Sequence, residues 1–281
     1  MLTYLKIFCL GSVCMFTLAA CAGSAYQLPQ VSDAEVNALE QDFATNDAPL
    51  KKYKRSDSHY QKRLTRISNN LLNHVEPLCA VSDYPDCHFE VVYDNSAEVN
   101  AYASEGYKVT IFKGLLDYLK NDDEMAAVVA HEIGHHLANH NEETERNATT
   151  GALVSGVLTA VVLGAANANN PYYSSFNQQQ DQQAIQDMMQ VGYGIGALSY
   201  SKEQEKEADL LSAYLLSHAG YNLERAQNLM WVLNKLDGDN GKYRASLLDT
   251  HPASPERYIA WQMAQAEIES NSTKLPYPKG Q

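Results

Sequence analysis

The sequence predicts an α+β fold that is mostly helical and contains one small β-sheet. Apolar residues recur at three- and four-residue steps along several long segments, which is the period of helices that bury one face. Only two short runs, residues 89–93 and 109–112, have the β-branched and aromatic residues typical of strands. Residues 56–270 are long enough to form one domain with its own core.

The start of the chain has the pattern of a secretory signal peptide, residues 1–20, which is excluded from the fold. Lys6 precedes a short apolar core, and Leu-Ala-Ala-Cys at residues 18–21 resembles a bacterial lipobox. This resemblance implies cleavage before Cys21 and attachment of lipid to that residue. An ordinary signal peptide or an uncleaved anchor is the alternative. Because Ala22 rather than Asp follows the cysteine, we expect attachment to the outer membrane, facing the periplasm.

The segments on either side of the domain are predicted to contribute little to its core. Residues 21–55 read as a lipidated N-terminus and a tether, with Val36, Leu39 and Phe43 spaced as on a short helix. Residues 271–281 read as a loose C-terminal tail.

Two cysteines remain once the leader is removed and Cys21 carries lipid. These are Cys79 and Cys87, in an oxidising compartment where pairs of cysteines become disulfides. Pro85 and Asp86 lie between them and suit a closed turn. The sequence therefore predicts a disulfide, with two free buried thiols as the alternative.

Helices are predicted at both ends of the domain. Residues 60–75 carry an apolar stripe at helical spacing. Two more helices, at about residues 223–236 and 255–269, close the domain. Ser254 followed by Pro255 is a cap with proline at the first helical position.

Residues His131 to His135 form a complete H-E-x-x-H pattern. On an α-helix residues i and i+4 share a face, so both imidazoles can point at one metal ion with Glu132 beside it as a proton acceptor. Asn121 and Glu124 have the spacing of a capping box that opens this helix. The alternative is a chance match on a surface helix, but the apolar residues on most sides of this helix indicate that it is enclosed.

A second predicted helix offers the remaining ligand. It opens with a capping box at Ser201 and Gln204 and ends near Gly220. Glu205 and Asp209 lie at i and i+4 on it and therefore share a face. One carboxylate can bind a metal ion, and the other can hold a ligand histidine by its second ring nitrogen.

Three neighbouring residues have no predicted part in the site. Glu203 and Glu207 point away from the face of Glu205 and Asp209, and we expect both to be solvated and paired with nearby lysines. His140 is expected near the end of the H-E-x-x-H helix, where a cation is favoured.

Taken in order, these motifs resemble the HtpX and CAAX-protease type of zinc metallopeptidases, family 48 of the metallopeptidases, and within it a branch of bacterial periplasmic lipoproteins. In that family a helix bearing E-x-x-x-D follows H-E-x-x-H. His251-Pro252 and Arg257 match the family's downstream motif, and residues 100–116 resemble the elements before its zinc helix. The resemblance covers roughly residues 56–270. It implies a zincin-like domain whose sheet has an edge strand near the H-E-x-x-H helix.

The resemblance also implies a role for each site residue. One Zn²⁺ per chain is expected, held by His131, His135 and Glu205, with Asp209 behind the ligands. Glu132 is expected to be the general base. His251 is assigned to the site with three roles left open: stabilising the oxyanion, occupying the open zinc position at rest, or acting only structurally.

The segment of residues 147–183 contains no charged residue before Asp181. Residues 151–166 are mostly small and apolar, and a little short of the roughly 20 residues that span a bilayer. We expect a helix packed against the zinc helix and then, in the glutamine-rich part, a mobile loop near the cleft. The alternative for that part is a surface insertion with no role at the cleft.

The strand over Val109, Thr110 and Ile111 is predicted to be a half-buried edge strand along the cleft. An edge strand can bind an extended polypeptide through main-chain hydrogen bonds, which read shape more than sequence. We therefore expect these three residues to bind substrate.

The charge of the chain limits its partners. The net charge is −13 and no basic cluster occurs, which argues against binding nucleic acid. The function expected from the resemblance is zinc-dependent hydrolysis of unfolded or misassembled envelope proteins, with the membrane contacted through the lipid at Cys21. The alternative is a chaperone-like or scaffolding lipoprotein whose zinc site is structural or auto-inhibited.

Overall fold

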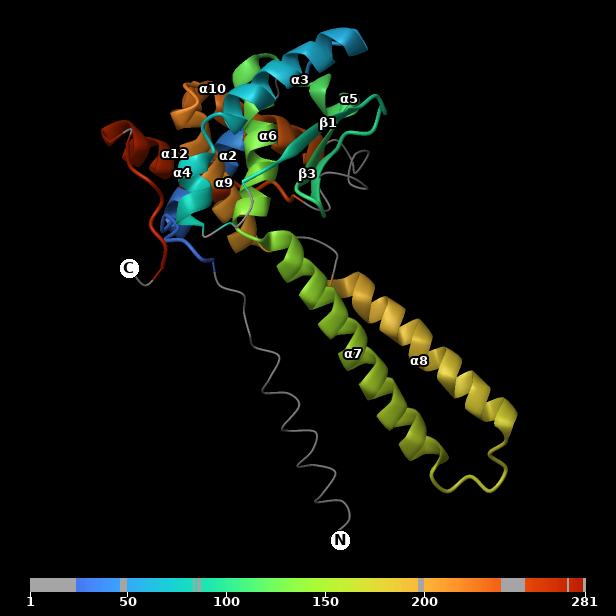
Figure 1. The fold of residues 1–281 in the computed structure, drawn as a ribbon. Helices are drawn as coiled ribbons and strands as arrows, with labels where there is room; N and C mark the ends of the chain where they lie inside the picture. Colours follow the sequence, from blue (N-terminus) through green and yellow to red (C-terminus); the bar gives the residue numbers. More distant parts are fainter. Residues whose placement is uncertain are drawn as a thin grey trace.

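The computed structural model describes residues 24–45, 50–82, 84, 87–196, 200–238, 251–271 and 273–279. The predicted signal peptide and Cys21 lie outside the described residues. Within them the chain forms a compact helical body with a small sheet on one side, and a long helical hairpin projects from that body (Figure 1).

The structure confirms the mostly helical α+β prediction. The helices of the body are α2 (Asp33–Thr45), α3 (Asp57–Leu72), α4 (Glu76–Val81), α5 (Lys113–Leu116), α6 (Asp122–Leu137), α9 (Lys202–His218), α10 (Leu223–Gly238) and α12 (Pro255–Ser270). The strands are β1 (Glu90–Asp94), β2 (Ala101–Ser104) and β3 (Lys108–Phe112). The predicted caps at Asn121, Ser201 and Ser254 are all present, each accepting a hydrogen bond from a backbone N–H of the first turn.

Helix α6, which carries H-E-x-x-H, runs through the centre of the body. It packs against α9, α10, α3 and β2, and its residues from Asp123 to Leu137 are buried. Gly134 allows the closest approach to α9, because a Cβ atom at this position would lie 2.7 Å from the backbone oxygen of Ala208. The sequence of α6 thus brings it against α9 at the level of the predicted ligands.

The sheet corrects the prediction about residues 109–111. The strand order is β1-β3-β2, so β3 is the central strand, parallel to β1 and antiparallel to β2. Val109, Thr110 and Ile111 are buried, and their backbone groups face strands on both sides. The polar residue Thr110 made β3 look like a strand with one exposed side, but in the structure Thr110 is buried. The edge strand that packs against α6 is β2.

The segment after α6 also differs from its prediction. It forms a helical hairpin of α7 (His140–Asn167) and α8 (Ser175–Gly196), so the glutamine-rich part is a helix and not a loop. Helix α7 packs along α8 and contacts α6 only weakly. Gly192 permits close packing in the hairpin, since a Cβ atom there would lie 2.3 Å from the backbone oxygen of Gly151. By length and composition, α7 is the one helix among the described residues that could cross a membrane.

The N-terminal and C-terminal segments pair with each other. Tyr26 and Pro278 form an antiparallel bridge, and Lys279 donates its backbone N–H to the carbonyl oxygen of Ala25. Tyr26 is almost completely buried. The segments predicted to be a tether and a loose tail therefore pack on the domain at these residues.

The predicted disulfide is present. Cys79, in α4, and Cys87 form it, with their Cα atoms 5.8 Å apart, a usual separation for a disulfide.

Candidate metal centre

Four buried side chains direct ligand atoms toward one point between α6 and α9. They are His131 and His135 on α6, Glu205 on α9 and His251, and their ligand atoms all lie within 4.8 Å of one another. The i, i+4 spacing of the two histidines places both on the side of α6 that faces α9. The capping box at Ser201 fixes the start of α9, so that Glu205 meets both histidines.

The separations between these atoms fit a tetrahedral metal ion. The Nε2 atoms of His131 and His135 are 3.1 Å apart, and Glu205 oxygens lie 3.3 Å from His135 Nε2 and 3.4 Å from His131 Nε2. Ligands 2.0–2.2 Å from a tetrahedral zinc ion are separated from one another by about 3.3–3.5 Å. The donor set of two imidazoles and a carboxylate is one that zinc prefers.

The charge around the cluster also favours a cation. Glu132, Glu205 and Asp209 are buried together, and Arg257 is the one fully buried guanidinium among the described residues. A divalent ion would place positive charge beside these carboxylates, and buried charges are stable only when they are compensated.

The side of each ligand histidine away from the cluster is held in place. For His131, the Nδ1 atom lies 3.0 Å from a carboxylate oxygen of Asp209. Burial lowers the pKa of His131, but Asp209 and Glu205 outweigh this effect and raise it to about 10. Asp209 thus lies where the sequence places it, behind the ligands.

Arg257 fixes both carboxylates of α9. Its Nε and Nη2 atoms donate to the two oxygens of Asp209 at 2.7 and 2.8 Å, and Nη1 lies 2.6 Å from Glu205 Oε2. Burial raises the pKa of Glu205, but the charges of Arg257 and His251 reverse this and bring it well below its usual range. Glu205 is therefore a carboxylate, ready to bind a cation.

His135 is held by residues that the sequence did not point to. Its Nδ1 atom lies 2.9 Å from Nδ1 of His140, and Nε2 of His140 lies 3.1 Å from Glu207. Glu207 is buried and also accepts the backbone N–H of Tyr26, so the expectation that it is a solvated charge is wrong. The expectation for Glu203 is confirmed, since its side chain is 55% exposed and lies 3.7 Å from Lys206.

The contact between His140 and His135 depends on a break in the helix. Asn139 has a φ of 60°, in the left-handed region, and it ends the path of α6 so that α7 starts in a new direction. His140 is the first residue of α7 and reaches back to His135. The ring of Tyr200 stacks on the ring of His135, with centroids 3.8 Å apart. An asparagine before His140 is the signal that sequence analysis missed.

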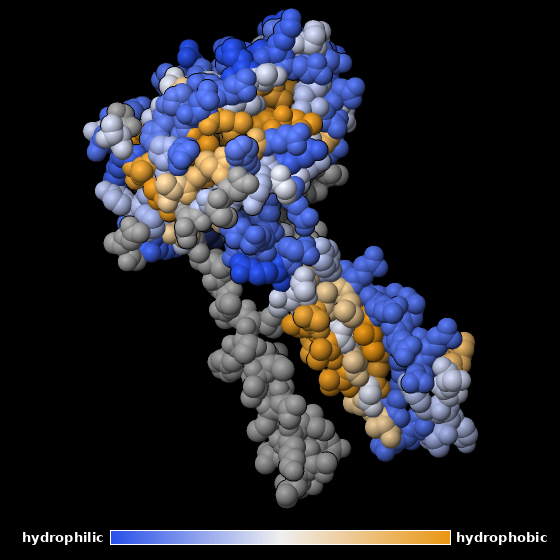
Figure 2. All heavy atoms as spheres, in the orientation of Figure 1, coloured by the Kyte–Doolittle hydropathy of each residue, from blue (hydrophilic) through white to orange (hydrophobic). Residues whose placement is uncertain are grey.

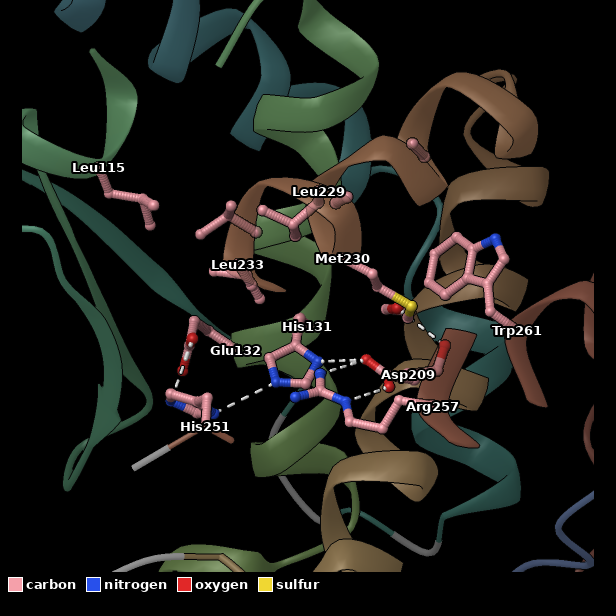
Figure 3. A pocket seen from close by; sticks show the side chains of 14 residues that line it. Leu115, His131, Glu132, Asp209, Leu229, Met230, Leu233, His251, Arg257 and Trp261 are labelled. Atoms are coloured by element: carbon pink, nitrogen blue, oxygen red, sulfur yellow. Dashed lines mark hydrogen bonds and ion pairs between the residues drawn. The ribbon is translucent and has the colours of Figure 1, made fainter. Parts of the chain in front are cut away.

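Glu132 lies beside the cluster and faces a pocket. Its carboxylate is 3.6 Å from Nε2 of His251, and Figure 3 shows both residues on the same side of His131. The far wall of the pocket is apolar and is formed mainly by Leu115, Leu229, Met230, Leu233 and Trp261. A group bound here would meet the carboxylate and an apolar surface together.

Residues 66–263 match Peptidase family M48, and this segment contains every residue of the cluster. The chain belongs to peptidase family M48. As a member of this family it is a metallopeptidase, and the buried cluster is the group that can hold the metal ion. The family predicted from the sequence motifs is therefore confirmed.

Several M48 relatives are similar over most of this chain. Metalloprotease LoiP of Escherichia coli is 29% identical over 85% of this chain and 84% of its own length. The β-barrel assembly-enhancing protease of Yersinia pestis is 28% identical over 86% of this chain, which spans 46% of that relative. The mitochondrial metalloendopeptidase OMA1 of Arabidopsis thaliana is 30% identical over 67% of this chain, and the match covers 34% of OMA1.

Proposed function

We propose that this M48 peptidase is a zinc-dependent endopeptidase that hydrolyses unfolded or misassembled proteins of the bacterial cell envelope. The observation that carries the proposal is the approach of His131, His135 and Glu205 to separations of 3.1–3.4 Å, with Glu132 beside them. Two imidazoles and one carboxylate at tetrahedral separations are a ligand set of catalytic zinc sites.

The roles of the chain's own residues follow from their positions. Bound zinc would supply Lewis acidity and a water molecule of lowered pKa. Glu132 is not among the four clustered ligands and its Oε2 has no hydrogen-bond partner, so it would act as the general base that takes up a proton at the site and passes it to the leaving amine. Asp209 and His140 keep the ligand histidines oriented.

His251 supports a second candidate function, a chaperone-like or scaffolding protein with an auto-inhibited or structural zinc site. Its Nδ1 atom lies 3.3 Å from His131 Nε2 and 2.9 Å from Glu205, so it completes a group of four ligand atoms. A fourth protein ligand takes the position that a catalytic zinc site keeps for water. We propose that His251 is this resting ligand, and that it must leave before substrate is cleaved.

The substrate class rests on the pocket and on the relatives. The apolar residues that line the small cavity beside Glu132 favour apolar over charged substrate groups, and unfolded proteins expose more apolar side chains than folded ones. One relative is named for enhancing β-barrel assembly, which supports envelope proteins as the class. With β3 central, β2 is the strand that offers an edge to an extended polypeptide near α6.

The location rests on the leader. Residues 18–21 have the lipobox pattern, so we propose cleavage before Cys21 and attachment of the mature chain to the outer membrane, facing the periplasm. The disulfide between Cys79 and Cys87 supports an oxidising compartment.

The test compares cleavage of casein, an unfolded substrate, by wild-type protein and Glu132→Gln, with bound zinc measured in both. We expect both proteins to hold zinc and the variant to lose at least about 100-fold in cleavage, because a general base is removed. Zinc in both proteins without cleavage by either, even in His251→Ala, would support the structural or scaffolding alternative.

A further inference from the structure

The helical hairpin presents an apolar face that nothing in the described chain covers. On α7, five large apolar residues are each between 57% and 65% exposed: Leu153, Val157, Leu158, Val161 and Val162. Leu153, Val157 and Val161 are four residues apart and share one side of the helix. Figure 2 shows this face as a continuous hydrophobic patch along the projecting hairpin, with a hydrophilic region between it and the hydrophobic band on the body.

The face is free of charge along its whole length. No Asp, Glu, Lys or Arg occurs between Arg146 and Asp181. The next basic residue after Arg146 is Lys202, beyond the hairpin. Water-exposed helices normally alternate apolar and charged residues, so this helix has the composition of one that faces hydrocarbon.

The chain that leads to the proposed lipid anchor enters the domain at the root of this hairpin. Glu207 accepts hydrogen bonds from the backbone of Tyr26 and from His140, the first residue of α7, at 3.0 and 3.1 Å. Cys21 is five residues before Tyr26 in the sequence, and a fully extended chain of that length spans at most about 18 Å. Lipid on Cys21 would hold the start of α7 close to a bilayer.

We propose that the α7 face of the hairpin lies in the surface of a phospholipid bilayer and forms a second membrane contact besides the lipid on Cys21. This inference rests in part on the lipid anchor proposed above. At 1.5 Å per residue, Leu153 and Val162 lie about 20 and 33 Å along α7 from His140. A hairpin anchored at its root and lying along the membrane would therefore place the whole patch at the bilayer surface.

Helix α8 explains why the hairpin lies on the bilayer and does not cross it. It carries Asp181, Asp187 and most of the glutamines of the segment, and burying these carboxylates in hydrocarbon would be costly. Ile185 and Met189 face α7 at Gly156, which leaves the polar side of α8 on the far side of the hairpin. A helical segment with one apolar face and one polar face lies parallel to the membrane, at the boundary between lipid and water.

The residues at the tip of the hairpin also favour contact with a lipid bilayer. Tyr172 is 87% exposed and Phe176 is 65% exposed, in the turn and first residues of α8. Tyrosine rings favour the level of the lipid headgroups. A second copy of the chain is a poorer occupant, because pairing these faces would bring together two chains of net charge −13.

The test uses the mature chain from residue 21 with an NBD fluorophore attached to a single introduced thiol. Val161→Cys places the label on the α7 face, and Gln183→Cys is the matched control at a similar level on the polar side of α8. Cys79 and Cys87 are joined in a disulfide, and Cys21 either carries lipid or is replaced by serine, so the introduced thiol is the reactive one. Each variant is made with Cys21 intact and with Cys21→Ser, and mixed with phosphatidylcholine vesicles whose acyl chains carry a nitroxide quencher.

We expect the nitroxide to remove most of the emission at position 161 and little at position 183, with no dependence on salt. Val157→Ser added to the labelled Val161→Cys protein should lower vesicle partitioning several-fold. An exposed-residue control, Tyr277→Ser, should not. Quenching at 161 in the Cys21→Ser protein would show that the hairpin binds lipid without the anchor.

Three outcomes would overturn the proposal. The first is vesicle-bound protein with equal, weak quenching at 161 and 183. The second is no vesicle binding at all by the Cys21→Ser protein. The third is a blue shift at 161 that follows protein concentration in the absence of lipid, which would assign the face to a second copy. The measurement uses neither zinc nor cleavage, so its failure leaves the proposed proteolysis untouched.

Discussion

The Nε2 atom of His140 lies 3.1 Å from the carboxylate of Glu207 and joins the root of the hairpin to α9. If Nε2 of His135 binds the metal ion, its Nδ1 carries the proton and donates to His140. His140 must then donate through Nε2 to Glu207, so the direction of both hydrogen bonds is fixed. The N-terminal segment, the hairpin and the metal centre therefore meet at one carboxylate, which also accepts the backbone N–H of Tyr26.

Replacing Glu207 or His140 by alanine should weaken zinc binding by about 10–100-fold, because the partner that orients His135 is lost. Zinc affinity measured by competition with a chelator checks this. Glu203→Ala is the matched control, since Glu203 lies on the same helix and its side chain is 55% exposed. Equal affinities in all three variants would mean that His135 needs no support from this chain of hydrogen bonds.

Gly134→Ala should lower the free energy of unfolding by about 1–3 kcal/mol, because its Cβ atom would lie 2.7 Å from the backbone of Ala208 and would push α6 and α9 apart. Urea unfolding of the zinc-free protein measures this. In the control, Gly164→Ala, the added Cβ atom has nothing within 4 Å and sits in an exposed helix. That variant should be neutral or more stable by about 0.5–1 kcal/mol. A Gly134→Ala protein as stable as Gly164→Ala would contradict the close packing.

Asp209→Asn should destabilise the protein by about 3 kcal/mol at neutral pH, because it leaves part of the buried charge of Arg257 without its partner. Burial raises the pKa of Asp209, but Arg257 lowers it further, so the folded-state pKa lies below the unfolded value of about 3.9. The contribution of Asp209 is therefore complete above about pH 4 and is lost as the pH falls below it. Urea unfolding of both zinc-free proteins should show their difference shrinking below pH 4. A difference that grows on acidification would have the wrong sign.

His251→Ala should retain zinc and cleave casein faster than wild type, because a ligand atom that completes the buried cluster is removed. Initial rates at equal zinc content provide the measurement. A slower variant would instead assign His251 to stabilising the reacting carbonyl, which is the other role that its distance of 3.6 Å from Glu132 allows.

Reduction of the disulfide between Cys79 and Cys87 should lower the free energy of unfolding by about 2–3 kcal/mol, the chain-entropy value for so short a loop. Thiol labelling of unreduced native protein should find neither cysteine. Modification of either one without a reductant would count against the bridge.

The sequence predicted the parts of the site that depend on local geometry. The spacings of His131 with His135 and of Glu205 with Asp209 determine which side chains share a helix face, and the capping residues determine where each helix starts. Both kinds of signal act within a few residues of the chain, so one sequence is enough to read them.

The remaining errors concern contacts between distant segments. The pattern of β3 contains no information about which strands flank it, so a central strand with a buried threonine resembled an edge strand. Glu207 resembled a solvated charge because its partners, His140 and Tyr26, are 67 and 181 positions away. For α7, apolar composition predicted burial against α6, whereas the structure pairs it with α8 and leaves one face exposed.

The central claim is tested most directly by counting zinc ions per chain in the purified mature protein, Glu132→Gln, Glu205→Ala and Glu203→Ala. Elemental analysis after dialysis should give one zinc per chain in wild type, Glu132→Gln and Glu203→Ala, and a near-complete loss in Glu205→Ala, because only Glu205 among these acids belongs to the group that can hold a metal ion. Wild-type protein without zinc, or a Glu205→Ala variant that keeps a full complement, would contradict a zinc centre held by α6 and α9.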